Sequence, residues 1–456
     1  MTTRRAFLQQ SAATAAAIGF PAVLRAANPN SMVQVAAVGV NGMGYSDLHS
    51  ISSHEKVKYV GFCDVDTSRF DKADALIAGV PHWQDFREMF DKLGDKFDAV
   101  NIAIPDHMHA KVATEAMKRG KHVYCQKPLA RTVWEVRQMR LWAEKKGLIT
   151  QMGNQIHSSV EYRMGTELIR SGAIGKVKEV HSWVSVTGNE RTRLLEPPAP
   201  GPVPSSLNWD LWIGGAPMRD YAPDAYHPFV WRDWQDFGDG ALGDFGCHIL
   251  DPVYTSLGLQ APISVIADNS GINKQVWPVN EIVQWVFPGN DLTADKTIKV
   301  TWTDGGVKPA RKIAQMPPEM ELPGSGSVFI GEKGNMVLAH VAGPRLYPTE
   351  NFTGFTPPKI EKIDSHWHRW INGILENKKT SDGFHFSGWV AETVQLGNVA
   401  TLMTKHPSGS KGGQVITGPG AVALEWNAAN LKFPNMPEAE KHLTRTYRAG
   451  WEVEAA

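Results

Sequence analysis

From residue 33 to residue 152 the chain repeats a unit that few folds accommodate: a short apolar run, a turn and a helix-like stretch. The apolar runs are rich in valine, isoleucine and alanine, and they lie at 33–38, 57–63, 98–105 and 122–125. Strands that alternate with helices at this spacing favour a parallel sheet covered by helices on both faces. We therefore expect an α/β protein whose residues 32–152 form a doubly wound parallel sheet.

The turn after the first predicted strand is rich in glycine and consists of Gly39, Val40, Asn41, Gly42, Met43 and Gly44. Such a turn lets backbone amides at a helix N-terminus meet a diphosphate, although Asn41 stands where the usual fingerprint has its middle glycine. Asp64 ends the next predicted strand, where an acid accepts hydrogen bonds from ribose hydroxyls and repels a 2′-phosphate. We predict a Rossmann domain that binds NAD in preference to NADP through Gly39, Asn41, Gly42, Met43, Gly44 and Asp64.

Beyond residue 152 the pattern changes to one-sided alternation of apolar and polar residues. It is present at 177–186, 281–287, 299–302 and 327–330, and helix-like patterns follow at 366–375 and 388–403. Alternation with a period of two is typical of strands with one buried face. We expect residues 153–456 to form a C-terminal α/β domain with an open, mostly antiparallel sheet.

A helix starting near Leu242 would bring Asp244, His248 and Asp251 onto one face. A carboxylate and an imidazole on one face can act together as an acid/base pair. The same spacing also suits a polar face turned to water, or a metal site, although no second cluster of ligand residues stands nearby. We predict acid/base chemistry here and no metal.

The first residues read as an export signal. A twin-arginine motif at Thr3–Leu8 precedes a mildly apolar run at 11–20 and small residues near 25–27. We therefore expect residues 1–30 to be a signal peptide recognised by the twin-arginine export machinery, and the protein to be periplasmic. No later apolar run is long enough to cross a bilayer, so we expect no membrane insertion.

The charge balance bears on the partner. The chain has 47 basic and 47 acidic residues, so no overall field attracts nucleic acid. Tryptophans gather between residues 183 and 234, and aromatic rings suit the apolar faces of sugars. We predict a small, roughly neutral sugar-like ligand.

Four motifs in order carry a resemblance to a known family. They are Pro105–His107, the Gln-Lys-Pro triplet at 126–128, the helix with Asp244 and His248, and Gly331–Gly334. In this combination the chain resembles the Gfo/Idh/MocA oxidoreductases, which include glucose-fructose oxidoreductase and inositol dehydrogenase. The resemblance implies that Lys127 lies by the nicotinamide, that His248 is the catalytic acid/base and that Asp244 is its partner. It also implies a second domain that mediates homo-oligomerisation.

The resemblance and the neighbouring sequence together suggest the remaining site residues. We predict further cofactor contacts at Pro105, His107, Gln126, Lys127 and Asn154. For the substrate we predict Lys127, His157, Tyr226, Trp231, Arg232, Asp244 and His248. Gln126 replaces the family's usual glutamate and so removes a negative charge beside Lys127, and we hypothesise that Gln126→Glu would raise the pKa of the lysine.

The implied reaction is hydride transfer between NAD and a carbon of a sugar, glycoside or cyclitol, catalysed by Lys127, His248 and Asp244. Because the periplasm holds no NAD pool, we expect the cofactor to be tightly bound. Three alternatives remain. One is redox-neutral cleavage of a glycoside through a 3-keto intermediate, one is a non-catalytic exported sugar- or nucleotide-binding protein, and one is a metal-dependent hydrolase that uses Asp244, His248 and Asp251.

Overall fold

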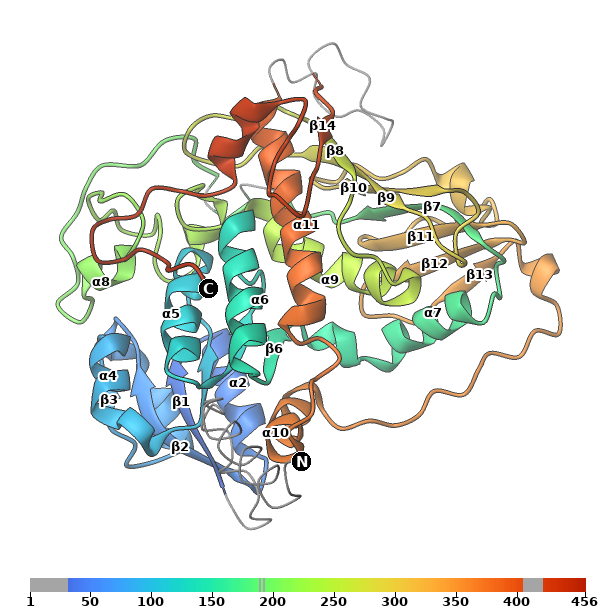
Figure 1. Ribbon diagram of the computed structural model, residues 1–456. Helices are drawn as coiled ribbons and strands as arrows, with labels where there is room; N and C mark the ends of the chain where they lie inside the picture. The colour runs from blue at the N-terminus through green and yellow to red at the C-terminus, as the bar shows by residue number, and fades with distance from the viewer. Residues whose placement is uncertain (1–31, 188–189, 192, 405–420) are drawn as a thin grey trace, which may run out of the picture.

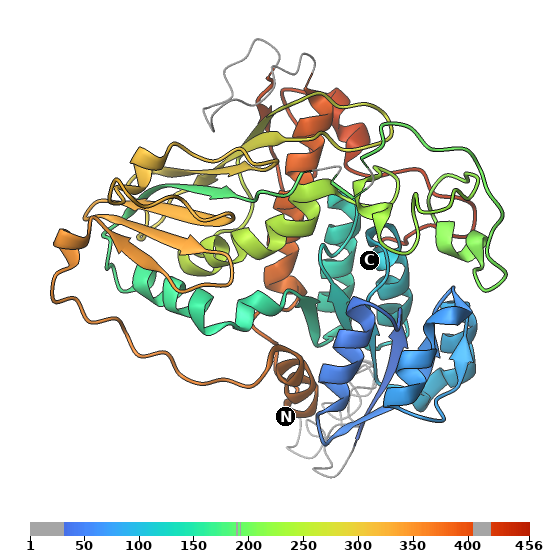
Figure 2. The same ribbon diagram turned by 180° about the vertical axis from the view of Figure 1, so that it is seen from behind.

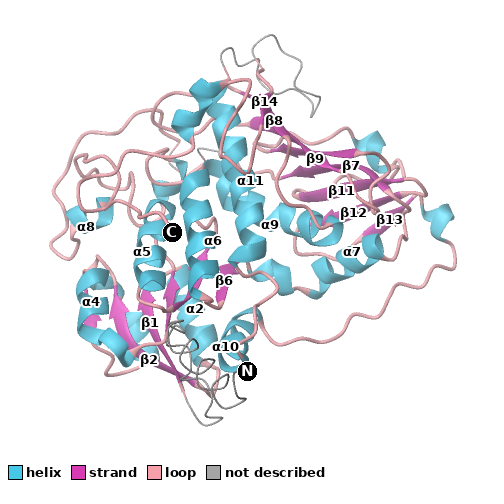
Figure 3. Cartoon of the chain, in the orientation of Figure 1, coloured by secondary structure: helices cyan, strands magenta, loops and turns pink. Residues whose placement is uncertain are grey.

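The computed structural model describes residues 32–187, 190–191, 193–404 and 421–456. The predicted signal peptide lies outside the described residues. The rest of the fold consists of two sheets with helices between and around them (Figures 1 and 3). None of the helices in the described part of the chain is both long enough and apolar enough to span a membrane.

The N-terminal sheet is parallel and has the strand order β3-β2-β1-β4-β5-β6. Its strands are β1 (Val33–Val38), β2 (Val57–Cys63), β3 (His82–Trp83), β4 (Ala99–Ile102), β5 (His122–Gln126) and β6 (Thr150–Gly153). The strand order reverses between β1 and β4, and in such sheets ligands bind at this point, outside the carboxyl ends of the strands. The predicted doubly wound Rossmann sheet is confirmed.

Helices cover both faces of this sheet, which is why its strands are apolar on both sides. One face packs against α4 (Phe86–Leu93), α5 (Asp106–Lys118) and α6 (Val133–Lys146). The other packs against α2 (Met43–Ser52), α3 (Asp71–Leu76) and α10 (His366–Glu376). Because α10 comes from the C-terminal part of the chain, the two halves of the sequence share a core.

The C-terminal sheet is mixed, with the order β13-β12-β11-β7-β10-β9-β8-β14, and only its β7–β10 pair is parallel. Its strands are β7 (Val177–Trp183), β8 (Ser264–Asn269), β9 (Glu281–Pro288), β10 (Thr297–Thr303), β11 (Gly326–Gly331), β12 (Asn335–Ala339), β13 (Arg345–Tyr347) and β14 (Leu424–Glu425). This confirms the predicted, mostly antiparallel sheet.

Three helices pack on one face of the second sheet: α7 (Val160–Arg170), α9 (Gly240–Leu257) and α11 (Phe384–Met403). Figure 2 shows α7 and α9 running along this face. The short helix α8 (Trp209–Ile213) lies apart from them, in the tryptophan-rich segment between residues 183 and 234, here called the aromatic segment. The first turns of α9 reach the end of β5, and this contact brings together the residues predicted to be catalytic.

Candidate active site

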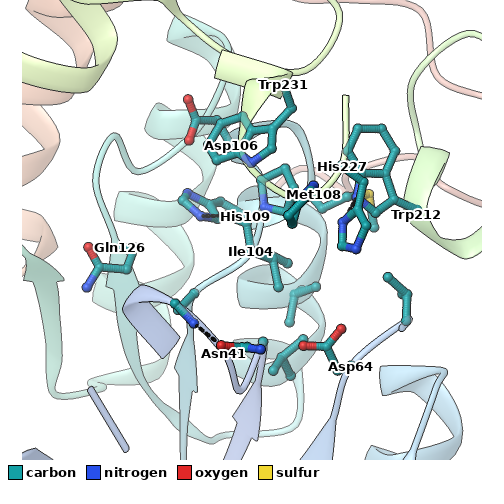
Figure 4. A pocket seen from close by; sticks show the side chains of 18 of the residues that line it. Asn41, Asp64, Ile104, Asp106, Met108, His109, Gln126, Trp212, His227 and Trp231 are labelled. Carbon is teal, nitrogen blue, oxygen red and sulfur yellow. Dashed lines mark hydrogen bonds between the residues drawn. The ribbon is translucent and has the colours of Figure 1, made fainter. Parts of the chain in front are cut away.

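A cavity of about 530 Å³ lies beyond the carboxyl ends of the Rossmann strands (Figure 4). Its walls combine the glycine turn, the ends of β2, β4 and β5, the start of α9 and part of the aromatic segment. Eleven of the predicted site residues line it, and ten of them are Gly39, Asn41, Gly42, Met43, Asp64, Pro105, Gln126, Lys127, Trp231 and Arg232. Asp244 also lines it.

The glycine turn is shaped as a diphosphate site requires. A Cβ on Gly39 would lie 2.1 Å from the carbonyl oxygen of Ala103, and one on Gly44 would lie 2.2 Å from that of Gly39. Both glycines therefore allow the close packing of turn and helix. Asn41 replaces the middle glycine of the fingerprint, and its side-chain oxygen accepts from the Gly42 amide at 2.7 Å. No side chain caps the N-terminus of α2, and Gly42 and Met43 at this helix end line the cavity, so the helix end can bind an anion there.

Asp64 ends β2 and lies where a ribose is bound in such folds. One carboxylate oxygen accepts from the Val40 amide at 3.2 Å, and the other from the Asp66 amide at 3.1 Å. Burial raises the pKa of Asp64 to about 6. Arg69, the nearby cation that could hold a 2′-phosphate, instead donates to Asp66 at 2.9 Å. The residues present fit NAD.

Lys127 and Asp244 are in direct contact. Lys127 Nζ lies 2.5 Å from Asp244 Oδ1 and 2.7 Å from the Asp244 carbonyl oxygen. The other carboxylate oxygen of Asp244 pairs with Arg191, and Arg232 lies 3.5 Å from Oδ1. Burial alone would raise the pKa of Asp244, but the charges of these three cations outweigh burial and hold the pKa well below its usual range. Asp244 is therefore a fixed anion at this end of the cavity.

The predicted pairing of Asp244 with His248 is wrong. Both residues lie on one side of α9, but the carboxylate turns to the cations because a neutral imidazole attracts an anion less. His248 Nδ1 instead lies 2.5 Å from Asn154 Oδ1. Asn154 therefore takes the place that the resemblance had assigned to Asp244.

The hydrogen bonds of Asn154 determine which nitrogen of His248 carries a proton. Asn154 Nδ2 donates to Asp251 Oδ2 at 3.0 Å and to the Cys247 carbonyl at 3.1 Å. Its Oδ1 must therefore accept the His248 Nδ1 proton, so Nε2 holds a lone pair. Burial and then the charge of Lys127 keep the pKa of His248 well below its usual value. His248 is a neutral base, and it remains partly exposed.

Three predicted binding residues lie behind the cavity wall. His157 contacts Asp251 at 2.8 Å and Ser381 at 2.8 Å. Tyr226 is buried among aromatic rings, and His107 is bonded to the Trp212 carbonyl. Burial lowers the pKa of His107 to about 3. His157, Tyr226 and His107 do not line the cavity, because these side chains turn to partners inside the core, and their contact with a ligand stays a prediction.

Gln126 does not support Lys127. Its amide Nε2 donates to Asp47 Oδ2 at 2.8 Å, and the indole of Trp367 donates to Asp47 Oδ1 at 2.8 Å. A glutamate at position 126 would therefore face the Asp47 carboxylate. Asp47 was missed in the sequence, although a polar residue beside Leu48 in the buried stripe of α2 was a usable signal.

Asp47→Asn is expected to weaken the dependence of stability on pH. Burial raises the pKa of Asp47 to about 7 in the folded state. Its contribution to stability is therefore present below the usual aspartate pKa and is lost as the pH rises towards 7. The difference in unfolding midpoint between pH 5 and pH 8 should shrink in Asp47→Asn. It should stay unchanged in the exposed control Asp295→Asn, and an unchanged difference in both variants would contradict the assignment.

Other residues at the site could not be found from the sequence. Arg191 and Trp451 come from irregular segments, and Trp212 comes from a short helix with no distinctive pattern. No group of three or more histidine, cysteine or acidic side chains in the described ranges is arranged to hold a metal ion. Asp244 pairs with Lys127, whereas His248 and Asp251 both hydrogen-bond to Asn154.

Comparisons with known proteins agree with this architecture. Residues 33–154 match the profile described as "Oxidoreductase family, NAD-binding Rossmann fold", and residues 185–283 match its C-terminal alpha/beta domain. The chain is 28% identical over 153 residues to levoglucosan dehydrogenase of Pseudarthrobacter phenanthrenivorans, covering 33% of this chain and 31% of that protein. It is 29% identical over 155 residues to a glycosyl hydrolase family 109 protein of a Shewanella species, covering 32% and 33%.

The chain thus spans about a third of the length of the curated relatives it matches. Solved structures are similar over more of the fold. Aldose-aldose oxidoreductase of Caulobacter crescentus aligns with a TM-score of 0.55 at 16% identity, covering 81% of this chain and 98% of that one. Levoglucosan dehydrogenase with NADH and levoglucosan aligns with a TM-score of 0.55 at 17% sequence identity, and the alignment covers 82% of this chain and 98% of that one. With both family domains matched in order, the chain belongs to the NAD-binding Gfo/Idh/MocA oxidoreductase family.

Proposed function

We propose that the protein transfers a hydride between NAD and a hydroxyl-bearing carbon of a sugar, glycoside or cyclitol. One observation carries the proposal. A neutral histidine base, held in one tautomer by Asn154, lies one helical turn from the Asp244 that anchors Lys127. Lys127 and Asp244 line the cavity that begins at the glycine turn. This combination suits removal of a hydroxyl proton next to a nicotinamide site.

Lys127 and His248 have different roles in the proposed oxidation of the alcohol. When bound, NAD supplies the hydride acceptor. Among the described residues both acceptors for Lys127 Nζ belong to Asp244, so one of its three N–H groups remains to donate to the substrate oxygen. His248 Nε2 takes the hydroxyl proton as the C–H bond yields its hydride, and Lys127 stabilises the negative charge that develops on oxygen.

A sugar-like substrate is supported by two observations. Trp231 and Arg232 line the cavity, and the Arg232 guanidinium lies 4.2 Å from the centre of the Trp231 ring. A ring beside a fixed hydrogen-bond donor matches the apolar face and the hydroxyl groups of a sugar. The relatives named levoglucosan dehydrogenase and aldose-aldose oxidoreductase point to the same substrate class.

The test begins with protein purified without added cofactor. Denaturation should release NAD(H), and adding aldoses, levoglucosan or cyclitols to the native protein should produce the absorbance of bound reduced nicotinamide. In the same screen His248→Ala should produce this absorbance at least about 100-fold more slowly. Protein that neither contains nor binds NAD(H) would refute the proposal.

A second candidate is redox-neutral cleavage of a glycoside through a 3-keto intermediate. The similarity to glycosyl hydrolase family 109 proteins over about a third of the chain favours it. In this reaction C3 of the substrate is oxidised, the aglycone is eliminated together with the C2 proton, water adds across the new C1–C2 double bond and C3 is reduced again, so no external oxidant is consumed. Release of nitrophenol from nitrophenyl glycosides without added NAD would select this candidate over net oxidation.

The cellular setting is also a proposal. We infer export through the twin-arginine pathway with NAD already bound, and assembly into a homo-oligomer. Cell fractionation of wild type and of a variant with Arg4→Lys and Arg5→Lys tests export, since the variant should stay in the cytoplasm. Light scattering on the purified protein tests assembly, and a monomeric mass would contradict it.

Asp64→Ala is expected to weaken NADH binding about 10- to 100-fold, as the loss of charge-assisted hydrogen bonds to a ribose would. Because an anion that repels a 2′-phosphate is removed as well, NADPH binding should fall less than NADH binding. Titration of protein fluorescence with both cofactors measures this. Asp66→Asn is the matched control, since Asp66 does not line the cavity, and its effect should be the smaller one. Equal losses for NADH and NADPH would place the ribose elsewhere.

A further inference from the structure

The end of the chain wraps back over the Rossmann domain. Residues 443–456, here called the C-terminal strap, leave the region above α11, pass α8 and end beside α5 and α6 (Figure 1). Within the strap, Arg445 Nε donates to Glu135 Oε1 at 2.8 Å, and the Tyr447 hydroxyl donates to the same oxygen at 2.8 Å. Glu135 is a buried residue of α6, so this attachment is specific.

The strap also joins the Rossmann helices to the aromatic segment. The Lys111 ammonium of α5 donates to the Glu452 carbonyl at 2.9 Å, and the Trp142 indole of α6 donates to that of Glu454 at 3.1 Å. On the other side, Arg448 donates to the Gly214 carbonyl at 3.1 Å and pairs with Asp210. The strap therefore bridges the two walls of the cavity.

Between these attachments Trp451 reaches the cavity. Its side chain is 5% exposed and lines the cavity together with Phe86, Met108 and Leu211. The Arg87 guanidinium lies 4.2 Å from the centre of the Trp451 ring and holds it in place. A chain segment far from the cofactor motifs in sequence thus provides part of the wall.

This wall lies at the adenosine end. Asp64 marks the ribose, and the residues beyond it, Gln84, Asp85 and Phe86, follow β3 and line the same cavity as Trp451. The aromatic segment also lines this end, where the Trp212 indole donates to His227 at 3.1 Å and His227 contacts Asp66 at 3.0 Å. Figure 4 shows Trp212 and His227 on the same side of the cavity as Asp64.

We propose that the C-terminal strap, through Trp451, closes the adenosine end of the site and makes release of NAD slow. This inference rests on the proposed function, because it concerns the same bound cofactor. In this proposal the glycine turn and Asp64 bind the dinucleotide, whereas the strap controls the rate at which the dinucleotide dissociates. Release requires the strap to part from α8, and the contacts of Arg448 with Asp210 and Gly214 oppose that movement.

The test measures the release of NADH rather than turnover. Protein loaded with NADH is mixed with excess NAD, and the loss of bound NADH fluorescence gives the rate. Trp451→Ala should accelerate release roughly 10- to 100-fold, as the loss of one base–aromatic contact would. Arg448→Gln, which leaves the cavity wall intact, should also accelerate release. The matched control is Trp426→Ala, a buried tryptophan outside the cavity, which should leave the rate unchanged.

A second ligand distinguishes a local effect from general damage. Reduced nicotinamide mononucleotide lacks the adenosine part, so its affinity should be the same in wild type and in Trp451→Ala. Unchanged NADH release in Trp451→Ala and Arg448→Gln, or an equal loss of affinity for both ligands, would overturn the inference. Wild-type protein that binds no NADH would instead refute the proposed function.

Discussion

His248→Ala is expected to lower turnover by about two to four orders of magnitude, the range that general acid–base catalysis supplies. The side chain is partly exposed and bonds only to Asn154 among the described residues, so its removal should leave NADH binding and the fold nearly intact. Steady-state kinetics, with the cofactor content measured on the same samples, test this. Turnover within a few-fold of wild type would remove His248 from the mechanism.

Asn154 offers a companion variant that acts through His248. In Asn154→Leu the imidazole loses the acceptor that keeps its Nδ1 protonated, so Nε2 no longer holds the lone pair in every molecule. Turnover should fall less than in His248→Ala. The double variant should be no slower than His248→Ala alone, because the two residues act as one unit. Additive losses would show that Asn154 works independently.

Lys127→Met is expected to lower turnover by about two to three orders of magnitude, as the loss of one donor to a developing oxyanion does. Arg191 and Arg232 stay beside Asp244 in the variant, so the carboxylate keeps partners and the fold should hold. Lys178→Ala, which removes an exposed lysine of β7, is the control and should keep full activity. Wild-type turnover in Lys127→Met would show that another group stabilises the oxygen.

The Lys127→Met variant should also shift the pH profile. The charge of Lys127 is one of the causes that keep the pKa of His248 below its usual value. Removing a nearby positive charge favours the protonated imidazole and so raises that pKa. The acid limb of kcat/KM should therefore lie below pH 6.5 in wild type and move to higher pH in Lys127→Met. An acid limb that does not move would show that the charge of Lys127 does not affect the pKa of His248.

Much of the cofactor domain could be predicted because its signals are local. A strand, its turn and the following helix are adjacent in sequence, so the glycine turn, Asp64 and Lys127 could each be placed at a strand end from the pattern around them. Sequence position could not show which predicted residues face the cavity. Pro105 and His107 are two residues apart, yet Pro105 lines the cavity whereas His107 is buried against Trp212. The two side chains point in different directions from the start of α5, and the sequence pattern does not show which direction faces the cavity.

Sequence alone determined the fold class and the position of the glycine turn, and the motifs of the family resemblance singled out Lys127 and His248 as candidates. These follow from hydrophobic periodicity and from motifs whose members lie within a few residues of one another. Only the tertiary structure decided the partners. Arg191 meets Asp244, Asn154 meets His248, and Trp451 reaches the adenosine end, each from a distant segment. Such contacts arise when separate elements pack into one core, and spacing along the chain carries no information about that packing.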